Sequence, residues 1–452
     1  MSDARFGRLG DEPASFLLAG VRIIDPNDGT DGIRDLAVMD GFIADASRVA
    51  GRVERIEADG LVAAPGLCDL HTHLREPGGE GAETIASGAR AAARGGFTAV
   101  CAMPNTDPAL DEPARVAWVA QRAVNAACRV RVIGAATVGR RGEALAEMGA
   151  MADAGAVAFS DDGAAIGSAR MTRAAMTYLA GLGRPLIEHA EDASLSAASV
   201  MRAGPTAAHL GLAGWPTSAE LTVVERDIAL AAETGARLHL THLSTAGALE
   251  AVRRARARGL PITCDVTPHH LAMTDEWVSG SRQFAWDDAS PEVTLVPDRA
   301  YDANCRVSPP LPSRADALAL LAAVADGTVD AIATDHAPHP PERKLVPFDE
   351  AAPGMIGLET ALSLGLAAVA AGRLELATLI AALSIRPAEI IGERRSLAIG
   401  QPADLVMFDP GARWRVEASA LASASANTPL LGMELSGVIR LTVADGRVTY
   451  RS

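Results

Sequence analysis

Residues that could bind a metal ion stand at the ends of several apolar runs in this sequence. His71 and His73 lie two residues apart at the end of the run "GLCDLHTH", and Arg75 follows two residues later. Imidazole nitrogens are common metal ligands, and a guanidinium beside them could bind an anion. This stretch therefore predicts a metal centre next to an anion-binding group, provided that the rest of the chain supplies the missing ligands.

Further candidate ligands end other apolar runs. They are Asp161 or Asp162 in "SDDG", His189 in "IEHAED", His242 in "THLS" and Asp335 in "ATDHAPH". Nitrogen and carboxylate ligands suit zinc and its neighbours. The ligand set is larger than one tetrahedral ion needs. We therefore expect one or two Zn²⁺ ions, with two favoured, sharing a bridging carboxylate and a bridging water that serves as the nucleophile.

Each motif taken alone also has a structural explanation. A His-x-His pair is weak evidence for metal, "SDDG" is typical of a turn or a helix cap, and His189 or His242 could be a core histidine. "ATDHAPH" is harder to explain in this way, because burying such polar groups at the end of an apolar strand is costly without a purpose. The repeated placement of these residues favours the metal centre.

The elements that must position these residues alternate between apolar runs and alanine-rich helical stretches. The runs are "GLCDLHTH", "TAVCAMPNT", "VRVIGAATV", "AVAFSDDG", "PLIEHAED", "LHLTHLST", "LPITCDVTPHH" and "VDAIATDHAPH". Alternating strands and helices predict a parallel sheet, and eight such units predict a (β/α)₈ TIM-like barrel. Active sites of such barrels lie at the carboxyl ends of the strands, so the candidate ligands should share one barrel mouth.

Both ends of the chain contain short strand patterns separated by turn residues such as "NDG" and "ADG". We expect residues 15–64 and 396–452 to form one small β-sandwich domain, and residues 65–395 to form the barrel. Residues 1–14 are predicted to be a disordered tail. The irregular span 277–303 is predicted to be a surface insertion between the last two barrel strands.

The other histidines are assigned no ligand role. His239 is out of phase with His242, which predicts that it points away from the barrel interior. His269 and His270 end the seventh strand and could support ligands from behind, and His336 is expected to orient a ligand. His209 is expected to lie in a loop or helix.

Composition narrows the class of protein. The net charge of −15 argues against nucleic-acid binding, which needs concentrated basic surface. No apolar stretch is long enough to span a membrane, and the first residues lack a signal peptide. Five scattered cysteines without a C-x-x-C pair are typical of a reducing compartment. These features predict a cytoplasmic protein that binds neither nucleic acid nor a membrane, and they say little about small-molecule substrates.

At these motifs the sequence resembles the dihydroorotases of the amidohydrolase superfamily, in particular their long-chain bacterial type. The motifs are "DLHTHLREPG", "AMPNT", "AFSDDG", "EHAED", "THLST", "VTPHH", "SPPL", "ATDHAPH" and "PGMIGLET". The resemblance implies that His71 and His73 bind one metal ion and that His189 and His242 bind the other. It also implies that Asp335 is both a ligand and the catalytic proton shuttle.

The resemblance also implies the bridge and the substrate contacts. By its spacing to His189, Asp162 takes the bridging position, with Asp161 the alternative. Arg75, Asn105 and His339 are implied to contact the substrate carboxylate. Ser308 replaces an asparagine that the family often has in "NPPL", and it is given no binding role.

Relatives such as dihydropyrimidinases and allantoinases bridge their metals with a carbamylated lysine near the fourth strand. The only lysine of this chain, Lys344, follows the eighth strand, so a carboxylate is left as the bridge.

The implied reaction is the reversible hydrolysis of dihydroorotate to N-carbamoyl-aspartate, a step of pyrimidine synthesis. A hydantoinase-like or allantoinase-like enzyme for neutral rings is the first alternative, against which Arg75 and the absent bridge lysine count. A non-catalytic scaffold for aspartate carbamoyltransferase is the second, against which the intact ligand set counts. A homodimer, and a catalytic chain that also binds this carbamoyltransferase, stay open.

Overall fold

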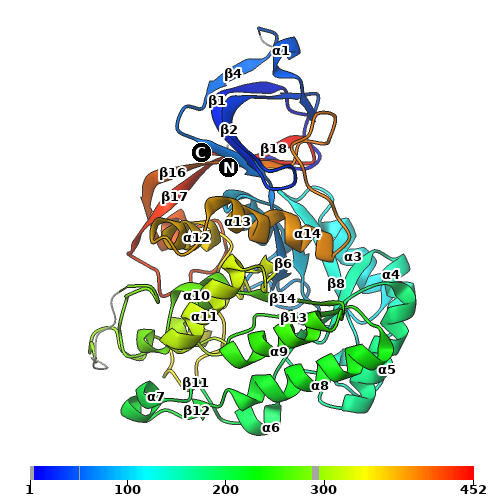
Figure 1. Ribbon diagram of the computed structural model, residues 1–452, viewed down its shortest axis with the longest axis vertical. Coiled ribbons are helices and arrows are strands. Elements are labelled where there is room, and N and C mark those ends of the chain that lie inside the picture. The colour runs from blue at the N-terminus through cyan, green and yellow to red at the C-terminus, as the bar shows by residue number, and fades with distance from the viewer. Residues whose placement is uncertain (1–4, 50, 288–294) are drawn as a thin grey trace.

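A computed structural model describes residues 5–49, 51–287 and 295–452 and shows a barrel with a smaller sheet domain above it (Figure 1). The barrel strands are β6 (Leu67–Thr72), β7 (Phe97–Ala102), β8 (Arg129–Ala135), β9 (Ala156–Ser160), β10 (Leu186–His189), β13 (Leu238–Thr241), β14 (Ile262–Val266) and β15 (Ala331–Ile332). Each strand pairs with the next in that order. A parallel bridge between Thr72 and His336 joins the last strand to the first. The predicted (β/α)₈ barrel is confirmed.

Helices cover the outside of the barrel. The longer ones are α2 (Ile85–Arg94), α3 (Pro113–Arg122), α5 (Ala169–Leu182), α8 (Ser218–Thr234), α9 (Ala246–Ala257), α11 (Arg314–Ala325) and α12 (Ala361–Ala370). Shorter ones are α4 (Met148–Asp153), α6 (Ala193–Ser196), α7 (Pro205–Leu210), α10 (Pro268–Ala272), α13 (Leu376–Ile380) and α14 (Arg386–Ile390). Helix α2 illustrates how the sequence sets a helix start and its buried face. Thr84 and Ser87 form a capping box at its N-terminus, and its alanines pack against the strands.

Alternate strand residues face opposite sides of the barrel wall. Leu67, Val100 and Leu240 belong to the cluster shared with the outer helices. Leu70 and Ile187 belong to a second cluster, which α14 joins and which fills the barrel beneath the histidines. This apolar filling leaves the carboxyl ends of the strands as the place where polar side chains can gather.

Both ends of the chain build the smaller sheet, as predicted. Its strands are β1 (Phe16–Asp25), β2 (Thr30–Met39), β3 (Phe42–Ala44), β4 (Glu54–Glu57), β5 (Val62–Pro65), β16 (Leu405–Arg415), β17 (Glu434–Ala444) and β18 (Arg447–Arg451), with the short helix α1 (Ala46–Val49). The antiparallel pairing of β5 with β16 joins the N-terminal strands to the C-terminal ones. The sheet encloses its own apolar cluster, which includes Leu18, Val38 and Leu405.

The prediction of a disordered tail over residues 1–14 does not fit the described part of this segment. Phe6 forms a bridge with Tyr450, and their rings lie 5.3 Å apart. The Leu9 amide donates to the Ala126 carbonyl at 3.0 Å. One aromatic side chain and a few backbone hydrogen bonds thus order a sequence that is polar overall. Residues 1–4 lie outside the described residues.

The span 277–303 is more than a surface loop. Trp277 and Val278 are buried in an apolar cluster that is separate from the barrel core. The Tyr301 hydroxyl donates to the Leu210 carbonyl at 3.0 Å. Its residues 288–294 lie outside the described part of the chain. Over the ranges that are described, no helix is long and apolar enough to cross a membrane.

Candidate metal centre and active site

The predicted ligands meet at the carboxyl ends of the barrel strands. They are His71 and His73 at the end of β6, Asp162 after β9, His189 at the end of β10, His242 after β13 and Asp335 after β15. All of them are buried. Residues far apart in the sequence are thus brought to one point by the order of the strands.

The carboxylate of Asp162 lies between two pairs of histidines. Its Oδ2 is 3.2 Å from His71 Nε2 and 3.6 Å from His73 Nε2. Its Oδ1 is 3.5 Å from His189 Nδ1 and 3.7 Å from His242 Nε2. One oxygen faces each pair, which is the arrangement that a carboxylate bridging two cations requires.

Asp335 approaches only the first pair. Its Oδ1 is 3.0 Å from His73 Nε2 and 3.5 Å from His71 Nε2. Two overlapping groups could therefore hold a cation, one formed by His71, His73 and Asp335 and the other by His71, Asp162 and His242. His189 completes the second group, since its Nδ1 lies 2.8 Å from His242 Nε2.

Asp161 points elsewhere. Its Oδ1 accepts hydrogen bonds from the backbone amides of Ala136 and Thr137, each at 3.0 Å, and its Oδ2 accepts one from the Thr137 hydroxyl. These bonds tie the end of β9 to the loop after β8. The geometry therefore gives Asp161 a structural role and favours Asp162 as the bridge.

Hydrogen bonds behind the histidines fix which nitrogen faces the centre. Nδ1 of His71 lies 2.9 Å from Thr241 Oγ1, and Nδ1 of His73 lies 2.8 Å from Asn105 Oδ1. In both rings the proton is then placed on Nδ1 and the Nε2 lone pair is free for a metal. His189 is reversed: its Nε2 lies 2.9 Å from Glu191 Oε2, and its Nδ1 faces the centre.

The prediction for His239 is wrong. Its Nε2 contacts Asp265 Oδ2 at 2.8 Å, and the Thr241 hydroxyl donates to the same oxygen at 3.0 Å. His239 therefore lies inside the barrel, on the face of β13 that supports His71. Alternate strand positions point to opposite faces only while the chain keeps strand geometry. His242 has a φ of 41°, so the chain has left strand geometry there and His242 cannot serve as the reference for His239.

Left-handed backbone conformations mark the mouth of the barrel. Arg75, His242 and Asp335 have φ values of 60°, 41° and 46°, which are unusual for residues with side chains. Such conformations cost free energy and are typical of residues that a functional site holds in place.

The two carboxylates and the histidines shift one another's pKa. Although burial opposes ionisation of every group here, Asp162 and Asp335 raise the pKa of His71 to about 9. His71 in turn helps to hold the pKa of Asp162 well below its usual range, and Asp335 is shifted in the same direction. Both carboxylates are therefore ionised at neutral pH, and the cluster favours a cation.

Orphaned polar atoms support the metal assignment. Within the described residues, His71 Nε2 and Asp162 Oδ1 are buried without a hydrogen-bond partner. Both atoms face the centre, and burying them unpaired would be unfavourable unless a ligand occupies the space between them. The residues present thus fit a divalent cation.

Arg75 and His339 lie together beside this cluster. The Arg75 guanidinium donates from Nε to the Pro338 carbonyl at 3.2 Å, and its Nη2 lies 3.5 Å from His339 Nε2. Burial and the neighbouring Arg75 lower the pKa of His339 to about 3, so this ring is neutral. Asn105 joins them through His73. Two of the three predicted substrate residues thus contact each other, and the third contacts the candidate ligand His73.

Sequence reasoning missed the residues that orient the ligands. Glu191, Thr241 and Asp265 each contact a ligand or its support. Glu191 stands two residues after His189 in "EHAED", which is a signal that could have been used. Ser308 reaches the same carboxylate, since its hydroxyl donates to Glu191 Oε2 at 3.3 Å. His270 bonds the Pro309 carbonyl, and His336 contacts Glu83.

Comparisons with known proteins agree with this geometry. Residues 60–248 match a family described as dihydro-orotase-like. Two relatives named dihydroorotase, from Citrifermentans bemidjiense and Anaeromyxobacter dehalogenans, are 42% and 45% identical over 443 residues. These alignments cover 97% and 96% of this chain and 100% and 98% of the relatives.

The solved structures extend the likeness to the fold. The L-hydantoinase (dihydropyrimidinase) of Arthrobacter aurescens superposes with a TM-score of 0.81 at 23% identity, covering 96% of both chains. At this identity the likeness concerns the fold alone. The full-length similarity to the two named relatives goes further: the chain belongs to the dihydroorotase family.

Proposed function

We propose that this protein catalyses the reversible hydrolysis of dihydroorotate to N-carbamoyl-aspartate at the centre formed by His71, His73, Asp162, His189, His242 and Asp335. The observation that carries the proposal is a largely buried arginine, Arg75, beside this centre. Within the described ranges it has no carboxylate at ion-pair distance. The Asp335 and Asp162 carboxylates stabilise its charge only through space, so N–H donors of its guanidinium are left for an anion. The carboxylate of dihydroorotate would accept from them.

The centre would hold one or two Zn²⁺ ions. His71, His73 and Asp335 would hold one ion, His189 and His242 the other, and Asp162 would bridge them. When bound, such ions lower the pKa of water and polarise a carbonyl group. The protein's part is to present four ring nitrogens and two ionised carboxylates, and hydrogen bonds to Thr241, Asn105 and Glu191 orient the rings of His71, His73 and His189.

Asp335 would carry the proton. In hydrolysis a water oxygen bonds to the ring carbonyl carbon, the carbon–nitrogen bond breaks, and the leaving nitrogen takes a proton. Asp335 is ionised and lies at the edge of the cluster, in contact with the first histidine pair only. It can therefore accept the proton of the attacking water and then donate it to the leaving nitrogen.

Arg75, Asn105 and His339 would select the substrate. A guanidinium can donate two parallel hydrogen bonds to a carboxylate. A neutral His339 adds shape and polarity to this side of the centre without adding charge. This arrangement favours an anionic ring over a neutral one.

The test compares two rings in the zinc-loaded enzyme. We expect kcat/KM for dihydroorotate to exceed that for dihydrouracil, which lacks the carboxylate, by about 10²-fold or more. Comparable values, or a preference for the neutral ring, would instead support a hydantoinase-like activity.

A further inference from the structure

The single lysine of the chain is buried and bound to backbone. Lys344 follows the 3₁₀ turn Pro341–Arg343, and only 6% of its surface is exposed. Its Nζ donates to the carbonyls of Ala303, Arg306 and Ala352 at 3.0, 3.3 and 2.7 Å. Among the residues that the structure describes, no carboxylate lies at ion-pair distance from it. The cation is therefore held by three peptide dipoles.

Three carbonyl partners require the charged form. An ammonium has three N–H donors, whereas a neutral amine has two and would leave one buried carbonyl without its partner. Burial lowers the pKa of Lys344 to about 7, and the nearby Asp302 carboxylate opposes this shift. At and below neutral pH the side chain can thus satisfy all three acceptors.

The three carbonyls come from two separate segments. Ala303 and Arg306 precede the "SPPL" motif, and Ala352 lies in the loop after the eighth strand. The Arg306 carbonyl also accepts from the Gly354 amide at 2.8 Å, and the Ala352 amide donates to the Arg343 carbonyl at 3.0 Å. Lys344 therefore joins segment 303–306 to segment 352–354.

Segment 352–354 in turn fixes His339. The His339 ring donates from Nε2 to the Pro353 carbonyl at 2.8 Å. Asn427 accepts from the His339 amide through Oδ1 at 3.0 Å and donates from Nδ2 to the Gly354 carbonyl at 3.2 Å. A side chain at Gly354 would come within 3.0 Å of His339 Nε2, so the segment packs closely on the ring.

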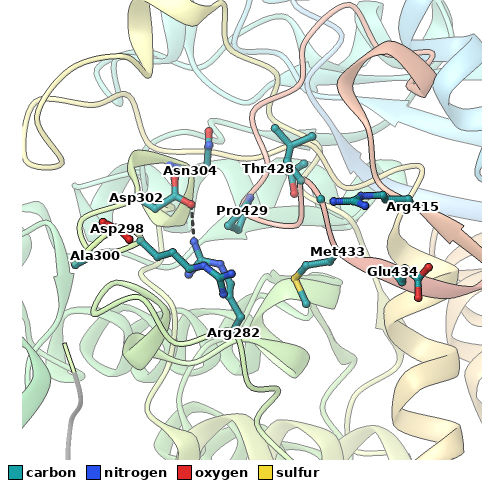
Figure 2. A pocket seen from close by; sticks show the side chains of 13 residues that line it. Arg282, Asp298, Ala300, Asp302, Asn304, Arg415, Thr428, Pro429, Met433 and Glu434 are labelled. Carbon is teal, nitrogen blue, oxygen red and sulfur yellow. Dashed lines mark hydrogen bonds and ion pairs between the residues drawn. The ribbon is translucent and has the colours of Figure 1, made fainter. Parts of the chain in front are cut away.

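The far side of segment 303–306 is also anchored. Asp302 forms an ion pair with Arg282 at 2.8 Å, inside a surface pocket of about 780 Å³ (Figure 2). A second pocket, of about 720 Å³, shares Asp302 and Asn304 and is lined by both Lys344 and His339. The ion pair anchors Asp302, which directly precedes segment 303–306. Loss of the Lys344 contacts would therefore free residues 352–354 from an anchored segment.

We propose that Lys344 is a positioning residue for substrate binding: its ammonium holds residues 352–354 against His339 and so sets the place of that ring in the site. This rests on the proposed function, in which His339 contacts the substrate carboxylate. Lys344 itself touches neither the substrate nor the metal centre. Its effect should therefore appear in substrate affinity and should pass through His339.

A double-mutant cycle on the zinc-loaded enzyme tests this. Lys344→Met removes the three donors at similar length, and we expect it to raise KM for dihydroorotate about 10-fold while kcat and zinc content change little. Lys344→Arg, which keeps a cation, should recover part of the loss. In a His339→Ala background, Lys344→Met should raise KM no further, because the ring that it positions is gone. Arg343→Met, an exposed neighbour, is the matched control.

The outcomes separate the two proposals. If His339→Ala leaves KM unchanged, His339 has no substrate role and both assignments fall. If His339→Ala raises KM but Lys344→Met adds its full effect in that background, only the role of Lys344 is overturned. A loss of zinc or of kcat in Lys344→Met, with KM unchanged, overturns it as well.

A measurement on the unaltered enzyme covers the case in which Lys344→Met does not fold. Since the chain has one lysine, ¹⁵N labelling at lysine Nζ gives one side-chain signal. At pH 6.5 we expect a slowly exchanging NH₃⁺ signal that shifts when dihydroorotate is added. A signal that exchanges as fast as that of free lysine, or one that substrate leaves unmoved, would contradict the proposal.

Discussion

Replacing Arg75 with methionine should separate substrate selection from metal chemistry. Methionine keeps much of the side-chain length but has no charge and none of the five N–H donors of arginine. Arg75 is not a metal ligand, and the contacts that orient His71 and His73 come from Thr241 and Asn105. Zinc content should therefore stay close to that of the unaltered enzyme.

The size of the effect follows from the burial of the guanidinium. It is mostly buried and donates a hydrogen bond to the Pro338 carbonyl, and within the described residues no carboxylate lies at ion-pair distance from it. Losing a buried charge-assisted contact costs about 2–5 kcal/mol. At about 1.4 kcal/mol per tenfold change, kcat/KM for dihydroorotate should fall between about 30-fold and a few thousand-fold.

The assay is the ratio of kcat/KM for dihydroorotate to kcat/KM for dihydrouracil, before and after the substitution. Dihydrouracil has no carboxylate, so its low rate of hydrolysis should change little and the ratio should collapse. Arg90→Met, in which an exposed arginine of α2 is replaced, is the control and should preserve the ratio. An equal loss for both rings would show that Arg75 supports the structure or the metal, and the reason for preferring an anionic substrate would be gone.

Three further predictions concern carboxylates. Asp335→Asn should keep most of the zinc but lower kcat about 10³-fold, because an amide cannot accept the proton; near-normal kcat would remove Asp335 from proton transfer. Asp162→Ala should lose more zinc than Asp161→Ala in a metal titration, and the reverse order would move the bridge to Asp161. Burial raises the pKa of Asp275 to about 6, so the contribution of this side chain to the unfolding free energy should fall by up to ~3 kcal/mol from pH 4 to pH 6, and Asp275→Asn should remove that contribution from the pH slope of denaturant melts.

The sign of the pH effect at Asp275 follows from proton binding. Between the unfolded pKa near 4 and the folded pKa near 6, the native state binds more protons than the unfolded state, so stability decreases as pH rises. An unchanged slope in Asp275→Asn would mean that other groups produce it.

The gathering of the candidate ligands at one place could be predicted because each of them ends an apolar run. His71, His189 and Asp335 are polar residues at points where strands leave the core, and a parallel barrel brings such points together. The choice between Asp161 and Asp162 needed the structure, because it depends on which carboxylate the loop after β8 engages.

Other parts of the site could not be predicted from residue types. The face of β13 on which His239 lies does not follow from strand alternation, because the left-handed conformation of His242 interrupts that alternation. The partners of Lys344 are backbone carbonyls, which every residue carries and which no sequence pattern marks. The order of residues 5–14 likewise depends on the distant partner Tyr450.

The most direct test of the central claim is a zinc titration of the metal-free chain with dihydroorotate turnover as the readout. The ligand set predicts that turnover is absent without metal, rises with added Zn²⁺ and reaches its plateau at no more than two ions per chain. Full turnover in the metal-free chain, or none at saturating zinc, would contradict the assignment of this cluster as the catalytic metal centre.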